Sequence, residues 1–233
     1  IRQSLVGSEM CIRDRLRDMV CVGKNYYAHA KEFFDSGFDA TQKETIPSEP
    51  IIFTKAMTSL VGPNDAIDSS IDPTHSVDYE GELGVIISKT ARRVAKADWK
   101  DYVFGYVIIN DVTSRELQKK HNQWTIGKGL DTFGPMGPYI VTKDEIDDLP
   151  SMQIQTLVNN EVRQQAKVRD LIFDIPTLIE TLTLTGTLLA GDIIATGTPV
   201  GVGIGFTPPK FLKSGDIVTI NVTGLGSLTN PVI

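Results

Sequence analysis

Three carboxylates lie close together in residues 78–82 (DYEGE), directly before the apolar run 83–87. In an extended strand successive side chains alternate between faces, so Glu80 and Glu82 would point to the same side. Two like charges that enter a buried strand repel each other and are costly to bury. A hard divalent cation would offset that cost, because carboxylate oxygens are its preferred ligands. A solvated strand end is the alternative that these residues leave open.

A third carboxylate, Asp111, follows the apolar run 103–109, which is typical of a fully buried strand. Together with Glu80 and Glu82 it would complete a set of three carboxylates. Such a set suits Mg²⁺, Mn²⁺ or Ca²⁺ and does not suit zinc, which favours cysteine and histidine. An octahedral ion held by three protein oxygens keeps positions for substrate and water. The alternative for Asp111 is a purely structural role as the cap of a following helix.

Acid–base chemistry is suggested by His29 and Glu32, which are three residues apart on the expected helix 26–34 and so share a face. The carboxylate could fix the imidazole tautomer and raise its basicity. Taken alone, such a pair is more often a surface ion pair. Lys128 lies between two glycines, where the backbone can approach a ligand closely, and its ammonium could hold a carboxylate or a developing oxyanion. A solvated turn lysine is the alternative.

Composition limits the class of protein. The 233-residue chain has a net charge of −6, which argues against a nucleic-acid-binding protein. No apolar stretch reaches the roughly 18 residues needed to span a bilayer, so no membrane is expected. The two cysteines, Cys11 and Cys21, give no disulfide framework, and a reducing, cytoplasmic compartment is therefore expected.

Short apolar runs between turn residues must position these side chains. They predict strands at 19–22, 51–54, 83–87, 103–109, 139–142, 153–159, 161–166, 193–196, 217–222 and 227–232. Helices are expected at 95–102, 113–121 and 175–184, and at 26–34 with Asn25 as its cap. Strands and helices do not alternate regularly, so we expect a β-rich α+β fold, a roll or sandwich, and not a doubly wound parallel sheet.

The N-terminal residues 1–15 differ in character from the rest. The string SLVGSEMCIRDR resembles a translated sequencing-adapter fragment, so we expect a non-native or disordered segment followed by a single catalytic domain, 16–233. Residues 38–50 are polar, carry two prolines and predict a mobile loop that could close over a site and set its specificity.

The strings VGKNY (22–26), YEGELG (79–84), NDVTSR (110–115) and TGTP (196–199) occur in one characteristic order. From about residue 19 to 233 the chain resembles the fumarylacetoacetate hydrolase family, specifically its small single-domain members, which include acylpyruvate hydrolases and hydroxymuconate-type isomerases. The resemblance implies a mixed β-sandwich roll with short peripheral helices, usually a homodimer. It also implies one divalent ion, Mg²⁺ or Mn²⁺, with Ca²⁺ possible.

The resemblance also implies roles for individual residues. Position by position, the metal ligands would be Glu80, Glu82 and Asp111, and the water-activating pair would be His29 and Glu32. Substrate contacts would come from Lys128 and Gln118, and further binding positions are Arg115, Lys55 and Thr198. Asp78 matches no ligand position.

The activity implied by the resemblance is cleavage of a C–C bond in a 2,4-dioxo acid, such as an acylpyruvate or a fumarylacetoacetate-like substrate, through a metal-stabilised enolate. His29, oriented by Glu32, would take a proton from the attacking water. Two alternatives stay open. The same site could serve a decarboxylase or an isomerase of 2-oxo or 2-hydroxy-unsaturated dicarboxylic acids, or the chain could bind a dicarboxylate without catalysis. The expected partner is a small 2-oxo acid.

Overall fold

The computed structural model describes residues 3–4, 17–39 and 44–233. Its strands are β1 (Gln3–Ser4), β2 (Met19–Gly23), β3 (Ile51–Lys55), β4 (Leu60–Val61), β5 (Val77–Asp78), β6 (Gly81–Ile87), β7 (Val103–Asn110), β8 (Thr113–Ser114), β9 (Gly134–Thr142), β10 (Gln153–Val158), β11 (Glu161–Lys167), β12 (Ile193–Ala195), β13 (Ile217–Val222) and β14 (Gly226–Pro231). The α-helices are α2 (Tyr27–Asp35), α3 (Arg115–Lys120), α4 (Thr125–Lys128) and α5 (Ile175–Thr185), and Lys96–Tyr102 forms a 3₁₀ helix, η3.

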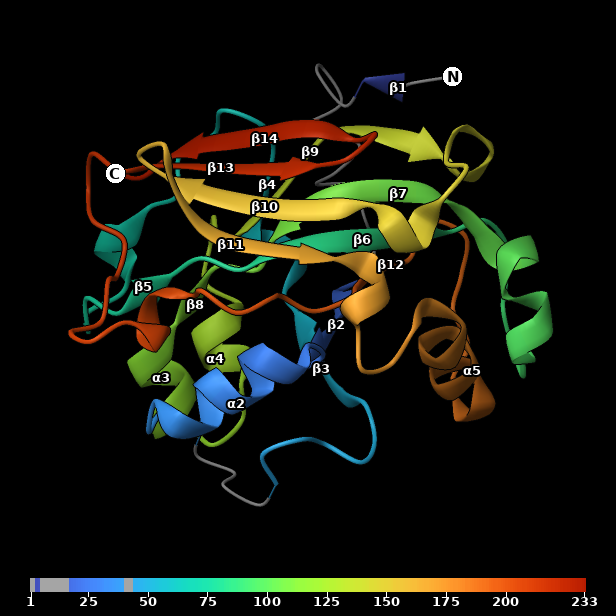
Figure 1. Cartoon of the computed structure of the whole chain (residues 1–233), viewed down its shortest axis with the longest axis horizontal. Helices are drawn as coiled ribbons and strands as arrows, with labels where there is room; N and C mark the ends of the chain where they lie inside the picture. Colours follow the sequence, from blue (N-terminus) through green and yellow to red (C-terminus); the bar gives the residue numbers. More distant parts are fainter. Residues whose placement is uncertain (1–2, 5–16, 40–43) are drawn as a thin grey trace.

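Two sheets pack on each other (Figure 1). The larger has the order β1-β9-β7-β6-β12-β2-β3, with β4 beside β9, and the smaller has the order β11-β10-β13-β14. Most neighbours are antiparallel, whereas β12 with β2 and β4 with β9 are parallel. Strands β5 and β8 form a small separate pair. This arrangement confirms the predicted β-rich α+β fold.

The core lies on both faces of the larger sheet because its central strands are apolar throughout. Leu83 and Val85 of β6 join the main core cluster, to which Ile154 and Ile220 of the smaller sheet also belong. Ile86, the next residue along β6, belongs to a second cluster. Successive side chains of β6 point to opposite faces of the sheet and pack into two different apolar clusters. This explains why the run 83–87 has no polar member.

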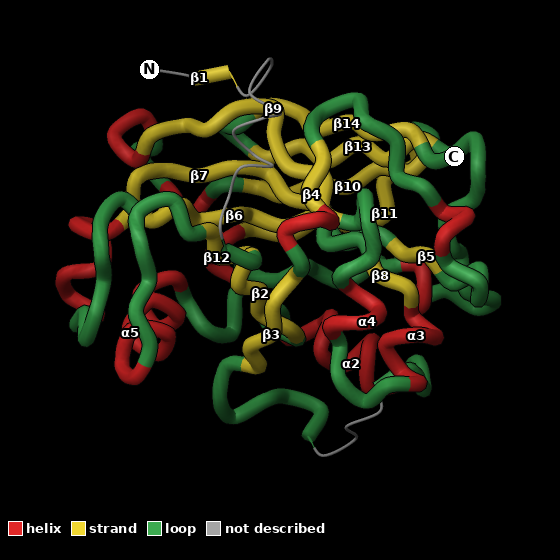
Figure 2. Tube along the Cα trace, turned by 180° about the vertical axis from the view of Figure 1, so that it is seen from behind, coloured by secondary structure: helices red, strands yellow, loops and turns green. Residues whose placement is uncertain are grey.

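Three short helices gather at one side of the molecule. Figures 1 and 2 show α2, α3 and α4 close together beyond the ends of β2 and β3, while α5 lies on the opposite flank. Gly127 of α4 fits against α3 because a Cβ there would lie 2.5 Å from the backbone nitrogen of Gln118. The larger sheet and the helices around α4 together enclose the predicted site residues.

Local structure departs from prediction at several points. Asn25 does not cap α2; its amide instead donates to the carbonyl oxygens of Phe173 and Thr196, and Tyr26 is the N-cap residue. Lys128 does not lie in a turn but ends the short helix α4. The two strands predicted at 153–159 and 161–166 form a hairpin, β10 and β11, and Asn159 and Asn160 between them both have positive φ.

Two predicted segments are only partly described. Of residues 1–15, the strand β1 pairs with β9, and the rest of the segment lies outside the described residues. The predicted mobile loop 38–50 includes residues 40–43, which also lie outside them. In the part of the chain that the structure describes, no helix is long and apolar enough to cross a membrane.

Candidate active site

The ends of two neighbouring strands bring the three predicted metal ligands together. β6 and β7 pair with Gly81 opposite Asn110, so Glu80 and Asp111 follow side by side at that end. The backbone N–H of Asp111 donates to the carbonyl oxygen of Glu80 at 2.9 Å. One carboxylate oxygen each from Glu80, Glu82 and Asp111 lies within 4.8 Å of the others, and all three residues are buried. This spacing could hold one divalent cation.

Three cations from other elements surround two of these carboxylates. Lys128 at the end of α4 donates to Glu80 Oε2 and to Asp111 Oδ2, each at 2.7 Å. Arg115 Nη1 lies 2.7 Å from Glu80 Oε1, and Lys55 Nζ lies 2.9 Å from Asp111 Oδ1. Burial by itself would raise the pKa of Glu80, but Lys128 and then Arg115 lower it to about 2. Glu80 is therefore ionised.

Glu82 has a different environment. Its Oε2 accepts a hydrogen bond from the backbone N–H of Gly197 at 2.8 Å, and no ion pair joins it to a lysine, arginine or histidine in the described ranges. Burial, followed by the charges of Asp111 and Glu80, raises the pKa of Glu82 well above its ordinary value. A divalent cation would supply the positive charge that this carboxylate lacks, so the donor set fits such an ion.

The predicted acid–base pair forms on α2. His29 Nδ1 lies 3.0 Å from Glu32 Oε2, and His29 is buried. Glu32 also accepts a hydrogen bond at 3.0 Å from the backbone N–H of Gly201. The bond to Glu32 places the imidazole proton on Nδ1 and leaves Nε2 to accept a proton. Gly205 packs so closely that a Cβ there would lie 1.8 Å from Glu32 Oε1.

A narrow cleft of about 10 Å³ joins these groups. The predicted residues that line it are His29, Glu80, Arg115, Gln118, Lys128 and Thr198. Its remaining lining residues, which the sequence did not identify as site residues, are Val22, Gly23, Lys24, Phe33 and Trp124. A larger cavity of about 580 Å³, lined by Trp99, Tyr106 and Leu171 among others, contains none of the predicted site residues.

Lys55, a predicted binding position, lies elsewhere. It does not line the cleft, is fully buried, and donates to the carbonyl oxygens of Val112, at 2.9 Å, and Lys128. Burial lowers its pKa. Lys55 therefore supports Asp111 and the end of α4 from behind. Thr198 does face the cleft, and its hydroxyl donates to the carbonyl oxygen of Gly81 at 3.1 Å.

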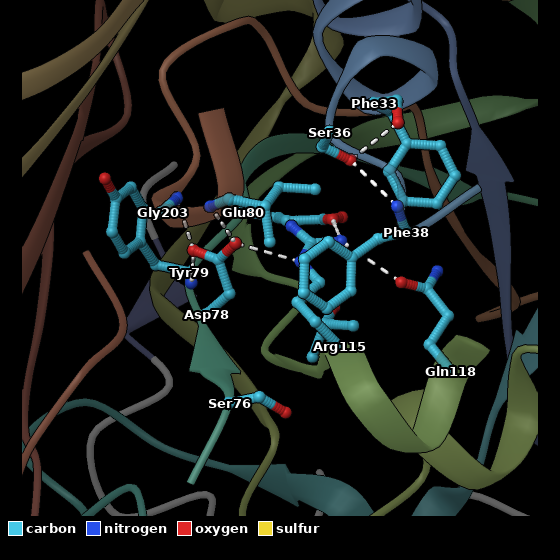
Figure 3. A network of polar contacts seen from close by, with 12 residues as sticks. Phe33, Ser36, Phe38, Ser76, Asp78, Tyr79, Glu80, Arg115, Gln118 and Gly203 are labelled. Atoms are coloured by element: carbon cyan, nitrogen blue, oxygen red, sulfur yellow. Dashed lines mark hydrogen bonds and ion pairs between the residues drawn. The ribbon is translucent and has the colours of Figure 1, made fainter. Parts of the chain in front are cut away.

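Two buried charges had no predicted role. Asp78 accepts a hydrogen bond from Arg115 Nε at 2.9 Å, as Figure 3 shows. Lys24 Nζ donates to Asp39 at 2.7 Å and to the carbonyl oxygen of Glu44 at 2.8 Å. The one available signal for Asp78 was its position two residues before Glu80. The sequence carries no comparable signal for Lys24.

Known proteins share both sequence and fold with this chain. The family model described as "Fumarylacetoacetate (FAA) hydrolase C-terminal" matches residues 18–233. The chain is 49% identical over 216 residues to the oxaloacetate tautomerase YisK of Bacillus subtilis (strain 168). The matched region covers 93% of this chain and 69% of that protein.

Solved structures agree with this result. A fumarylacetoacetate hydrolase from the psychrophilic Exiguobacterium antarcticum has a TM-score of 0.83 and 44% identity, covering 93% of this chain and 75% of that one. A 2-hydroxyhepta-2,4-diene-1,7-dioate isomerase from Mycobacterium marinum has a TM-score of 0.76 and 40% identity, covering 93% and 74%. Hydrolases and isomerases thus share this two-sheet fold. The chain belongs to the fumarylacetoacetate hydrolase family.

Proposed function

We propose that this chain is a divalent-cation-dependent enzyme that forms and reprotonates the enolate of a small 2-oxo dicarboxylic acid, with keto–enol tautomerisation of oxaloacetate as its reaction. The 49% identity to an oxaloacetate tautomerase supports this choice of substrate. Two cations, Arg115 and Lys128, line the cleft and suit a dianionic substrate.

One observation carries the proposal. A buried histidine with an oriented imidazole, two cations and one carboxylate of the acidic cluster line the same cleft: His29, Arg115, Lys128 and Glu80. Enolate formation needs a base near the acidic carbon and positive charge near the oxygen on which negative charge develops. These four side chains supply both requirements at one place.

The proton transfer follows from the His29–Glu32 pair. Nε2 of His29 takes a proton from C3 of the substrate, and the C–H electron pair becomes the C2=C3 double bond of the enolate. The negative charge of Glu32 stabilises the imidazolium that forms. Delivery of that proton to the C2 oxygen gives the enol, so no atom is gained or lost and the histidine is regenerated.

The cationic residues bind and orient the substrate. Arg115, which has one nitrogen without a partner among the described residues, holds a substrate carboxylate. Lys128 adds positive charge beside the enolate oxygen. A Mg²⁺ or Mn²⁺ ion held by Glu80, Glu82 and Asp111 would supply Lewis-acid polarisation of the 2-oxo group.

Hydrolysis of a 2,4-dioxo acid is the second candidate function. It is favoured by the same His29–Glu32 pair, which could activate water, and by the similarity to a fumarylacetoacetate hydrolase. Decarboxylation of oxaloacetate is a third use of the same enolate chemistry and needs no attacking water.

Parallel assays separate these reactions. Oxaloacetate added as its enol is followed by loss of enol absorbance for tautomerisation and by pyruvate formation for decarboxylation. Acetylpyruvate is followed by release of acetate and pyruvate. Each assay is run with Mg²⁺, with Mn²⁺ and with excess chelator. We expect metal-dependent loss of enol absorbance to be the fastest of these reactions. Metal-dependent cleavage of acetylpyruvate with no effect on the enol would instead identify a hydrolase.

The expected homodimer and the expected cytoplasmic location stay predictions. Light scattering after gel filtration tests the first, and fractionation of the source cells tests the second.

A further inference from the structure

Asp78 is a buried carboxylate, and hydrogen bonds to both of its oxygens hold it in place. Oδ1 accepts from the backbone N–H of Gly203 at 2.6 Å and of Tyr79 at 2.9 Å. Oδ2 accepts from Arg115 Nε at 2.9 Å and from the backbone N–H of Ile204 at 3.1 Å. Figure 3 shows Asp78 between Arg115 and Gly203. So many donors on one fully buried side chain fix its position closely.

This carboxylate fixes the direction of Arg115. A guanidinium is planar, so two anchored nitrogens determine where the third one points. Nε is anchored by Asp78, and Nη1 is anchored by Glu80 at 2.7 Å. Nη2 is buried and has no hydrogen-bond partner in the described part of the chain. Arg115 lines the cleft, so this free donor is available to a ligand carboxylate there.

The same carboxylate holds the loop of residues 201–204. Gly203 and Ile204 of this loop donate to Asp78. In addition, the Tyr79 hydroxyl donates to the carbonyl oxygen of Gly201 at 2.8 Å. The backbone N–H of Gly201 in turn donates to Glu32, the partner of His29. Asp78 therefore connects the cationic side of the cleft with its acid–base pair.

We propose that Asp78 is a positioning residue: it aims the free nitrogen of Arg115 at the substrate carboxylate and anchors the loop that orients Glu32. The proposal rests on the proposed function only for the identity of the substrate. A purely structural role for Asp78 would affect stability, but it would not discriminate between ligands that do and do not need Arg115.

The test is Asp78→Asn in the full chain loaded with Mn²⁺. The amide keeps one acceptor for Gly203, but presents a donor to the N–H groups of Arg115 and Ile204. We expect KM for oxaloacetate to rise about 10- to 100-fold, as for other residues that orient a site residue. Mn²⁺ affinity should stay at the wild-type value in calorimetry, and so should the binding of oxalate, whose two carboxylates would both chelate the metal and leave no carboxylate for Arg115.

A double-mutant cycle assigns the effect to Arg115. Arg115→Lys keeps a positive charge but loses the planar guanidinium whose direction Asp78 and Glu80 fix, and it should raise KM alone. Because Asp78 acts on substrate binding through Arg115 and on Glu32 through the 201–204 loop, Asp78→Asn should add no further rise in KM in that background, and only kcat should fall further. The matched control is Asp192→Asn, since buried Asp192 accepts from Arg17 at 2.9 Å and from a backbone N–H at 2.8 Å.

An unchanged KM in Asp78→Asn overturns the proposal, as do additive effects in the cycle or an equal loss of oxalate and Mn²⁺ binding. If wild-type protein binds oxaloacetate without turning it over, the proposed function fails, and the dissociation constant of oxaloacetate replaces KM in judging Asp78. If Asp78→Asn does not fold, Asp78→Glu is used, which keeps the charge but displaces the carboxylate, and the same rise in KM is expected.

Discussion

His29 depends on neighbours that come from distant parts of the chain. Glu32 holds its Nδ1 at 3.0 Å, and Gly201 in turn donates to Glu32 across 169 residues of sequence. Phe33, on the same helix, lies with its ring centroid 6.2 Å from that of His29. The imidazole is thus held by one polar and one aromatic contact, so its free nitrogen has a defined direction.

Replacing His29 by alanine should lower turnover by about 10²- to 10⁴-fold, the usual contribution of one general base. Metal affinity should stay near normal, because the carboxylates that would hold the ion are untouched. Initial rates and calorimetric Mn²⁺ titration measure the two effects. The exposed His121 offers the control variant His121→Ala, which should behave as wild type. Collapse of metal affinity in His29→Ala would contradict the assigned role.

Single residues could be predicted where their signal was local. Glu80 and Glu82 were identified from alternation along a strand, and the structure brings them to Asp111. Asp78 lies two residues before Glu80 but matches no ligand position. Its partners Arg115 and Gly203 are 37 and 125 residues away, so no local pattern could have indicated them.

At the scale of elements, the pairing of β6 with β7 and the packing of α4 on α3 build the site. The strands were predictable because apolar runs between turns mark buried strands. Helix α4 was not, since four residues with a central glycine carry almost no helical signal. It forms because Gly127 allows the two helices to touch, and that contact carries Lys128 to Glu80.

Gly127→Ala tests that contact. A Cβ would lie 2.5 Å from the backbone nitrogen of Gln118 and 2.7 Å from the carbonyl oxygen of Ser114, so the helices must separate. We expect a loss of about 1–3 kcal/mol in the free energy of unfolding, typical of overpacking, together with lower activity because Lys128 moves. Urea denaturation measures the first effect. Ile126→Ala, at a 53% exposed position of α4, is the control, and equal stability of the two variants would contradict the expectation.

The loop before β5 should give stability a defined pH dependence. Burial by itself would raise the pKa of Asp72, but hydrogen bonds from Thr74 and Ser76 outweigh it and lower that pKa. A lowered native pKa stabilises the fold above the ordinary aspartate value, and the contribution is lost as the pH falls through the native pKa.

Asp72→Asn should therefore cost about 1–2 kcal/mol at pH 7, a typical hydrogen-bond contribution. The difference in the free energy of unfolding between this variant and wild type should shrink as the pH falls below the ordinary aspartate range. Urea denaturation at a series of pH values measures this. Asp131→Asn, at an exposed position, is the control and should show no such trend. A difference that grows toward acid would refute the assignment.

At the scale of the whole molecule, the fold concentrates charge in its interior. The carboxylates lie at β6 and β7 in the larger sheet, Lys55 comes from β3 at the edge of the same sheet, and Arg115 and Lys128 come from helices α3 and α4. The sheet must therefore be complete and both helices must pack beside it before the acidic cluster is neutralised, and Glu82 is left without a cation within the described ranges. A bound divalent ion should consequently stabilise the folded molecule as a whole, beyond any effect on catalysis.

Thermal unfolding measures that link. Mg²⁺ or Mn²⁺ at a hundred times its dissociation constant should add about 2.7 kcal/mol to the free energy of unfolding. For a chain of this size that gain raises Tm by roughly 5–11 °C. Glu82→Gln should abolish the rise and the metal-dependent activity. Without metal it should melt no lower than wild type, because a buried charge is removed. Glu116→Gln, at an exposed position, should keep the full rise. A wild-type rise in Glu82→Gln would place the metal elsewhere and refute this acidic cluster as its site.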